Sequence, residues 1–410
     1  MNTNAHAIEK AVMWKSGGSR GLRLLVSCLL GLTLLAAPAF GQHLHQLEYN
    51  NSDWADTDIT AAAGGPTVYD IGVSAYVTSP NGQIHVFYVA SANSDENWDV
   101  HQLYYNGSTW TDQDLSALLG PTAYQGTGMS GFAIGNAQYV YFCDSFFNVH
   151  QFAYGDGGNW NWVDTNLNGV TGKGYPGTCA DYAISMSAIV TENGNRHVFF
   201  QGPDKNDGKN AIREFLWNGR EWSIPNLTTQ THGATGYGTF MSAVSIKYGS
   251  YLYFQSNVNG HIHEYSYLPA VGHWVDTDVT VASGGVPADT FEPNGPAAFA
   301  VPGKDQIEVY YSTGEEVHQM TFKNKKWTDE DLGGPAPYSL GQILAFATTP
   351  NNQFHVYYNG QGGSNTIDQM FFNGSSWSYG ALPGVPVGFA AGMGGFSVGN
   401  YQYVYYISAD

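Results

Sequence analysis

Histidine recurs at one position of a repeated phrase, so it is the first candidate for chemistry. The five copies are His45, His101, His150, His263 and His318. Imidazole is the commonest metal ligand in proteins, but equivalent residues of repeats arranged around a ring are too far apart to share one ion. We therefore interpret these histidines as packing or hydrogen-bonded residues and predict no metal site from them.

Pairs of aspartates spaced two residues apart are the second candidate. They are Asp56/Asp58, Asp112/Asp114, Asp276/Asp278 and Asp329/Asp331. Residues two apart lie on one face of a strand, where two carboxylates suit a hard cation or an acid and a base. Four near-identical copies favour a repeated structural device, such as hydrogen bonds to a neighbouring loop, and leave a cation site as the alternative. Since no nucleophile elbow, phosphate loop or zinc-protease motif occurs, no catalytic residue and no cofactor is predicted.

These residues belong to a hairpin phrase that the sequence repeats seven times. In VHQLYYNGSTWTDQDL (100–115), an aromatic strand is joined to a Trp-bearing strand by Asn106-Gly107, a pair that type I′ turns favour. The other copies begin at Leu44, Val149, Ile212, Ile262, Val317 and Ile367. Between copies lie two more strand-like phrases, one small and apolar such as MSAVSI (241–246) and one aromatic such as YLYFQS (251–256).

Four strands in each unit of roughly fifty residues indicate a β-propeller. After an N-terminal leader the chain starts with the third and fourth strands of a unit (44–59) and ends with the first and second (394–407), which together complete one blade. We predict an all-β fold, a seven-bladed β-propeller with four antiparallel strands per blade, closed by N- and C-terminal strands that share one blade. The small-residue strand is expected innermost and the Trp strand outermost. Two separate β-sandwiches would explain neither the seven hairpins nor the complementary ends.

The N-terminus has the features of a secretory signal peptide. Four basic residues precede an apolar run from Leu24 to Leu35, and AAPAFGQ with small residues follows. The run is short for a membrane span, and a lipoprotein-like LVSC (25–28) precedes most of it, which makes lipid attachment the weaker alternative. We predict a signal peptide at residues 1–41, cleaved near Gln42, and a propeller domain at residues 42–410. The mature chain is expected to be secreted or periplasmic, without membrane insertion.

The charge of the mature chain argues against nucleic acid as a partner. Loss of residues 1–41 removes four Lys or Arg and one Glu from totals of 15 and 34, which leaves 11 basic and 33 acidic residues and a net charge of −22. Such a surface repels phosphate backbones and anionic lipids. Of the three cysteines only Cys143 and Cys179 then remain. A disulfide between them is possible in an oxidising compartment, although the count leaves the pairing open.

The run from His197 to Trp222, HVFFQG…AIREFLWNGREW, resembles a blade of the fungal fucose-binding lectin propellers, as does the strand order of every unit. The resemblance covers nearly the whole mature chain. Bacterial seven-bladed lectin propellers give the closer blade count, since the fungal lectins have six. The resemblance implies sugar sites between blades. Each site would have an Arg on the second strand, a Glu on the third strand and a nearby Trp or Tyr. Aromatic rings stack on sugars while polar groups bind hydroxyls, and repeated sites add avidity.

The sequence departs from this scheme at both polar positions. The Arg position holds His85, Tyr139, His197, Tyr251, Glu308, His355 and Tyr403. Glu occupies the Glu position only at Glu214 and Glu264, while the other copies have Gln46, Gln102, Gln151, Gln319 and Gln369. The predicted carbohydrate-binding residues are therefore Glu214 or Glu264, with His197 or Tyr251 and with Trp222 or Trp274. Packing between blades is the alternative role for all six.

Together these features predict an exported, non-catalytic, lectin-like propeller whose partners are glycans. Two alternatives stay open: a scaffold for protein contacts at the cell surface, and an enzyme acting on polysaccharide. The ligand and the oligomeric state are not predicted.

Overall fold

The repeated phrases form seven four-stranded antiparallel sheets in the computed structural model of this chain. It describes residues 42–90, 98–124, 127–171, 179, 185–203, 210–234, 241–247, 249–289, 295–314, 316–334, 342–349, 351–360, 366–384 and 392–408, without the side chains of 69–71, 203 and 210. The predicted signal peptide, residues 1–41, lies outside them. Among the described residues, no helix has the length and apolar character needed to span a bilayer.

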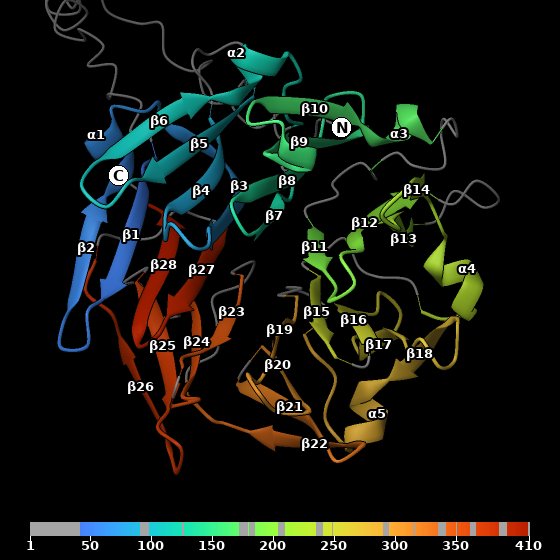
Figure 1. Cartoon of the computed structure of the whole chain (residues 1–410). Coiled ribbons are helices and arrows are strands. Elements are labelled where there is room, and N and C mark those ends of the chain that lie inside the picture. The colour runs from blue at the N-terminus through green and yellow to red at the C-terminus, as the bar shows by residue number, and fades with distance from the viewer. Residues whose placement is uncertain are drawn as a thin grey trace, which may run out of the picture. The chain divides into compact units, whose positions relative to one another are not determined.

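Each sheet is one blade, and the blades follow one another around a ring (Figure 1). Blades 1 to 6 contain β3–β6, β7–β10, β11–β14, β15–β18, β19–β22 and β23–β26, and blade 7 contains β27, β28, β1 and β2. The first strands contact each other from blade to blade, so they are innermost. The predicted all-β, seven-bladed propeller is confirmed.

The four strand positions have these bounds. The innermost strands are β3 (Val68–Val77), β7 (Ser130–Ile134), β11 (Met186–Val190), β15 (Ser242–Ile246), β19 (Ala297–Ala300), β23 (Leu344–Ala347) and β27 (Met393–Val398). The second strands are β4 (Ile84–Ala90), β8 (Ala137–Cys143), β12 (Arg196–Pro203), β16 (Gly249–Gln255), β20 (Gln306–Ser312), β24 (Phe354–Asn359) and β28 (Tyr401–Ile407). The third strands are β1 (Leu44–Tyr49), β5 (Asp99–Tyr105), β9 (Val149–Tyr154), β13 (Asn210–Trp217), β17 (Ile262–Tyr267), β21 (Val317–Lys323) and β25 (Ile367–Phe372). The outermost strands are β2 (Trp54–Asp58), β6 (Trp110–Asp114), β10 (Trp162–Asn166), β14 (Trp222–Ser223), β18 (Trp274–Asp278), β22 (Lys326–Asp331) and β26 (Trp377–Ala381).

Blade 7 closes the ring with strands from both ends of the chain, as predicted. β1 pairs antiparallel with β28, from Leu44 opposite Ile407 to Tyr49 opposite Gln402. Figure 1 shows these blue and red strands side by side. Pairing the two ends leaves no open sheet edge between the first and last blades.

The core lies between blades. Second strands are largely buried, and at five junctions between blades the fourth-strand tryptophan of the next blade packs edge-on against one of their rings. This contact is found for Phe87–Trp162, Phe199–Trp274, Tyr253–Trp327, Tyr310–Trp377 and Tyr357–Trp54, with interplanar angles of 76–90°. Edge-to-face pairs of this kind stabilise a packed core.

The second residue of each aspartate pair has a structural role that the sequence did not specify. In five blades a short helix follows the fourth strand: α1 (Ile59–Ala63), α2 (Leu115–Leu119), α3 (Leu167–Val170), α4 (Leu227–Thr231) and α5 (Val279–Ser283). The side chains of Asp58, Asp114, Asn166, Asn226 and Asp278 accept a hydrogen bond from a first-turn amide of these helices. The second acid is therefore a helix N-cap in three of the four pairs. In the fourth pair, Asp331 accepts a hydrogen bond from the Gly333 amide at 2.7 Å. The described residues also include a 3₁₀ turn, η1 (Asp156–Gly158).

The first residue of each pair holds the recurring histidine, as the structural interpretation expected. His45, His101, His150, His263 and His318 contact Asp56, Asp112, Asp164, Asp276 and Asp329 through Nδ1, at 2.8–3.3 Å. The preceding blade also reaches this carboxylate, since the Ala234 amide donates to Asp276 at 3.1 Å. The repeated His and Asp thus join neighbouring strands and blades.

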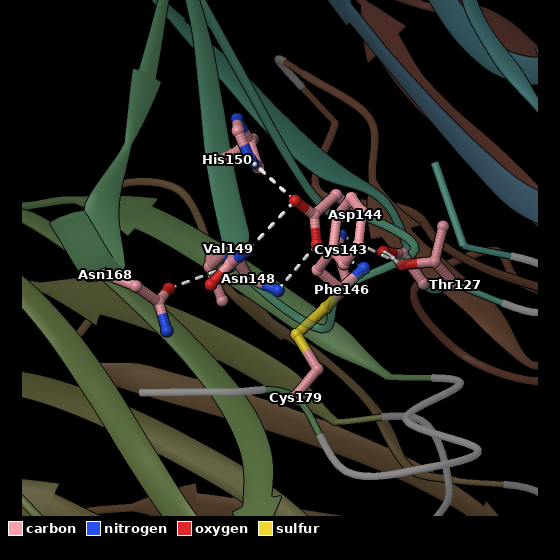
Figure 2. Close-up of a disulfide and its surroundings, with 10 residues drawn as sticks. Thr127, Cys143, Asp144, Phe146, Asn148, Val149, His150, Asn168 and Cys179 are labelled. Atoms are coloured by element: carbon pink, nitrogen blue, oxygen red, sulfur yellow. Dashed lines mark hydrogen bonds and ion pairs between the residues drawn. A yellow bond between two sulfur atoms is a disulfide. The ribbon is translucent and has the colours of Figure 1, made fainter. Parts of the chain in front are cut away.

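Cys143 at the end of β8 and Cys179 form a disulfide with a Cα–Cα distance of 6.4 Å (Figure 2). Both cysteines are almost fully buried. The Cys179 amide also donates to the Phe147 carbonyl at 2.7 Å. The bond ties the second strand of blade 2 to the long connection that leads to blade 3.

Beside the disulfide, His150 contacts Asp144 (Figure 2), and a second carboxylate, that of Asp164, contacts its other ring nitrogen. Its Nε2 is 3.0 Å from Asp144 and its Nδ1 is 2.8 Å from Asp164. Burial alone would lower the pKa of His150, but the hydrogen bonds and charges of these aspartates outweigh it and raise the pKa to about 9. The imidazolium is therefore the form present at neutral pH.

This pairing predicts a pH-dependent contribution to stability. Because the folded pKa lies above the unfolded value of about 6.5, the contribution is complete below pH 6.5 and is lost as the pH rises to about 9. The difference in the free energy of unfolding between wild type and the His150→Gln variant should fall by about 2–3 kcal/mol over that interval. Urea unfolding at several pH values measures it. The exposed His273→Gln variant should give a flat difference, and a flat difference for His150→Gln would contradict the pairing.

Candidate functional site

Side chains of neighbouring blades converge where the blades meet, and we name each such inter-blade site by its two blades. One blade supplies the residues at the Arg and Glu positions, and the next supplies a Trp hairpin and one side chain from the start of its second strand. We call this last side chain the wall residue. It is Ile84 at site 7/1, Gln138 at 1/2, Arg196 at 2/3, Ser250 at 3/4, Ile307 at 4/5, Phe354 at 5/6 and Gln402 at 6/7.

Site 1/2 contains a cavity of about 330 Å³. It is lined by Gln83, His85, Gln102, Tyr104, Gln113, Gln138, Tyr154 and Trp162. The side-chain nitrogen Nε2 of Gln102 donates to His85 Nδ1 at 2.9 Å and to the side-chain oxygen Oε1 of Gln138 at 2.7 Å. In the described part of the chain, no donor forms a hydrogen bond to the side-chain oxygen Oε1 of Gln102. This oxygen can therefore accept a hydrogen bond from a ligand.

The site 1/2 cavity is neutral. Burial lowers the pKa of His85 to about 4, so the imidazole carries no charge at neutral pH and its Nδ1 accepts from Gln102. The other polar lining groups are amides and tyrosine hydroxyls. Amides both donate and accept, as sugar hydroxyls do. Trp162 and Tyr154, whose ring centroids are 5.5 Å apart, provide the aromatic wall.

The same polar triad recurs at site 6/7. The Gln369 amide nitrogen donates to His355 Nδ1 at 3.0 Å and to the Gln402 carbonyl at 3.1 Å. Burial lowers the pKa of His355 to about 3. Tyr49 and Trp54 take the places of Tyr154 and Trp162, with centroids 5.3 Å apart. The arrangement is thus a repeated one, present at two sites of the ring that are separated by site 7/1.

Site 3/4 holds a smaller cavity of about 200 Å³, which His197, Ser250 and Tyr267 help to line. The Nδ1 atom of His197 contacts Oε1 of Glu214, whose side chain is fully buried (0% exposed). Glu214 Oε2 has no hydrogen-bond partner among the described residues. The wall residue here is the small Ser250, which lines the cavity.

Site 4/5 brings Tyr251 close to Glu264, and the two groups interact electrostatically. Burial raises the pKa of Glu264 to about 7, although the Tyr253 hydroxyl donates to it at 2.8 Å. Burial also raises the pKa of Tyr251 to about 12. The aromatic partner of this site is Trp327, which packs edge-on against Tyr253.

Site 2/3 is filled by the chain itself. The Arg196 guanidinium lies 4.7 Å from the ring centroid of Tyr139, 4.9 Å from Trp217 and 5.3 Å from Trp222. It also pairs with Asp156 at 3.2 Å and is only 4% exposed. A cation between aromatic rings is held by their quadrupoles, and here it occupies the place that the resemblance assigns to a sugar.

A third cavity, of about 440 Å³, lies over the turns between the first and second strands of blades 3 to 5. Its charged lining residues are Glu192, Lys247, Lys304 and Asp305. No aromatic ring lines it, so it lacks the stacking surface that a sugar needs.

The six predicted binding residues fall into three different sites. His197, Glu214 and Trp274 belong to site 3/4, Tyr251 and Glu264 to site 4/5, and Trp222 to the Arg196-filled site 2/3. Trp274 is 5% exposed and packs against Phe199 and Tyr267. The binding roles of these residues stay predictions, and the pairing of Trp222 with Glu214 in one pocket is not what the structure shows.

Site 1/2 is not among the sites predicted from the sequence, because His85 and Gln102 differ from the Arg and Glu that the resemblance implies at these positions. Two blades combine His at the Arg position with Gln at the Glu position, His85 with Gln102 and His355 with Gln369. That joint change was the available signal. The wall residue provides no such signal in the sequence, because its effect on a site depends on how it packs against the preceding blade.

No protein-family model matches the sequence, and no curated protein matches it. Solved structures share its fold. A triple mutant of AofleA from Arthrobotrys oligospora is 17% identical over 88% of this chain and 93% of its own, with a TM-score of 0.51. A mutant of Aleuria aurantia lectin in complex with alpha-methyl-L-fucoside is 19% identical over 77% and 95%, at 0.51. The fucose-specific lectin from Aleuria aurantia is 17% identical over 76% and 95%, at 0.50. The predicted resemblance to the fucose-lectin propellers is confirmed for the fold.

Proposed function

We propose that this chain is an exported, non-catalytic protein that binds carbohydrate between its blades, with site 1/2 as the principal site. The observation that carries the proposal is the neutral cavity in which amides of Gln102 and Gln138 lie opposite Trp162. Its volume of about 330 Å³ is at the small end of ligand sites. An aromatic ring for stacking and amides for hydroxyl groups are the two features that sugar binding requires.

The neutral lining favours neutral sugars. A carboxylated sugar would bring an anion to a strongly acidic protein and would find no cationic side chain in the cavity. The fucose-specific neighbour from Aleuria aurantia suggests fucose as the first sugar to test. Because His85 and Gln102 stand where that family has Arg and Glu, we propose neutral hexoses and deoxyhexoses as the class.

Two copies of the His–Gln–Gln triad support multivalent binding. Site 6/7 repeats the triad of site 1/2, and blades 7 and 1 lie between the two sites. Weak sites on one rigid ring gain avidity when a glycan surface presents several sugars. Export would follow from the predicted signal peptide at residues 1–41.

Replacing Trp162 with alanine should weaken glycan binding at least tenfold, which corresponds to about 1.4 kcal/mol, because the stacking wall of site 1/2 is lost. A glycan array with residues 42–410 identifies the ligand, and calorimetric titration measures the loss. Trp377→Ala is the matched control, since Trp377 has the same strand position and the same edge-on contact, 6.0 Å from Tyr310.

Tyr104→Ala removes another, partly exposed wall of the cavity, so it tests the site even if Trp162→Ala folds poorly. Equal binding by wild type, Trp162→Ala and Tyr104→Ala would rule out site 1/2. A blank array together with capture of a defined protein would favour the scaffold, and release of sugars from a polysaccharide would establish an enzyme.

A further inference from the structure

Three potential metal ligands converge at the outer end of blade 1. Asp99 and His101 lie on β5, and Asp114 lies at the end of β6, where α2 begins (Figure 1). One ligand atom from each residue lies within 4.8 Å of the other two. The two oxygens of Asp114 have different roles. Oδ1 caps α2 by accepting a hydrogen bond from the Ala117 amide at 2.7 Å. Its Oδ2 faces His101 Nε2 at 3.9 Å.

The buried imidazole provides an independent indication of a ligand. His101 is 4% exposed, and its Nε2 has no hydrogen-bond partner among the described residues. The 3.9 Å distance to Asp114 is too long for a hydrogen bond. A buried nitrogen left in this state costs free energy unless another species binds it.

A second layer of contacts fixes the tautomer that a metal requires. His101 Nδ1 lies 3.0 Å and 3.2 Å from the two oxygens of Asp112, so it carries the proton. The Tyr88 hydroxyl donates to the same carboxylate at 2.9 Å and orients it. The Nε2 lone pair is then directed toward Asp99 and Asp114. Metal-binding histidines commonly have this carboxylate behind them.

The equivalent positions of four other blades carry different residues or make different contacts. In blades 7 and 4 the counterpart of Asp99 is a histidine, and His43 and His261 bind the counterparts of Asp114 through Nδ1, at 2.6 Å and 2.7 Å. In blade 2, His150 Nε2 contacts Asp144. Blade 5 repeats the acid–His–acid set as Glu316, His318 and Asp331, with Asp331 exposed.

We propose that Asp99, His101 and Asp114 bind one divalent transition-metal ion, with Zn²⁺ as the best fit. One imidazole and two carboxylates supply three ligands, and water completes a four-coordinate shell. In a tetrahedral shell, ligands at about 2.0–2.2 Å from the ion lie about 3.3–3.6 Å from one another, so the two partly buried aspartates would have to rotate toward His101 to close the shell. Ca²⁺ is disfavoured because it prefers oxygen ligands.

The ion would join the third strand of blade 1 to the start of α2. This site is distinct from the carbohydrate site. Gln102, the neighbour of His101, points to the opposite face of the strand and into the site 1/2 cavity. Its role is therefore structural, and sugar binding should not require it.

Zn²⁺ titration of tag-free, chelator-treated residues 42–410 by calorimetry, together with a thermal melt, tests the proposal. Wild type should bind Zn²⁺ and gain at least about 2 °C in melting temperature. Asp114→Asn and Asp99→Asn should each lose one equivalent of bound Zn²⁺. Asp58→Asn is the matched control, since asparagine also caps a helix and His43 replaces the acid there; its stoichiometry should equal that of wild type.

Three outcomes would overturn the proposal. They are no Zn²⁺ heat and no melting shift in wild type, the same stoichiometry in Asp114→Asn as in Asp58→Asn, and stabilisation by Ca²⁺ but not by Zn²⁺.

Discussion

Replacing Arg196 with alanine is expected to lower the free energy of unfolding by about 2–4 kcal/mol. The substitution removes the guanidinium from between Tyr139, Trp217 and Trp222 and leaves a cavity among them. Loss of the ion pair with Asp156 adds little, because that carboxylate is 46% exposed and is hydrated without its partner. Denaturant unfolding of the two proteins measures the change.

Arg220→Ala is the control for Arg196→Ala. Arg220 lies exposed in the turn between β13 and β14, so its removal should change the free energy of unfolding by less than about 0.5 kcal/mol. Arg196→Met restores apolar volume but no charge, and it should recover part of the loss. Equal unfolding curves for Arg196→Ala and Arg220→Ala would show that Arg196 does not hold site 2/3 together.

Removing the disulfide should be similarly costly. Cys143 and Cys179 are 36 residues apart in sequence, and closing a loop of that length in the unfolded chain is worth about 3–4 kcal/mol. The double variant Cys143→Ser/Cys179→Ser should therefore unfold at a lower temperature and a lower denaturant concentration than wild type.

A reducing agent provides the internal control for the disulfide. It should lower the melting temperature of wild type to that of the double variant and leave the double variant unchanged. A melting temperature of wild type that does not respond to reductant, with both thiols accessible after unfolding, would show that the bond is absent from the protein.

The sequence was sufficient to predict the ring, because each blade repeats the same strand phrases and the two ends complete one blade. Local patterns of small, aromatic and Trp-bearing strands determine the position of each strand within a blade. The short helices were not predicted, since each has only four or five residues and depends on a single capping side chain.

The sites were less predictable because each is assembled from two blades. Glu214 and Trp222 are eight positions apart and lie on paired strands, yet they serve different inter-blade sites. Whether a site is open depends on the wall residue of the next blade. At site 2/3 this is the long Arg196, and at site 1/2 it is Gln138. Repeat alignment alone does not show which side chain faces which neighbour.

A crystal structure of residues 42–410 soaked with the glycan that binds most tightly on the array tests the location of the sugar directly. We predict electron density for a sugar ring against Trp162, with hydroxyl groups on Gln102 and Gln138, and none beside Arg196. Density for the sugar only outside site 1/2 and site 6/7 would contradict the proposed function.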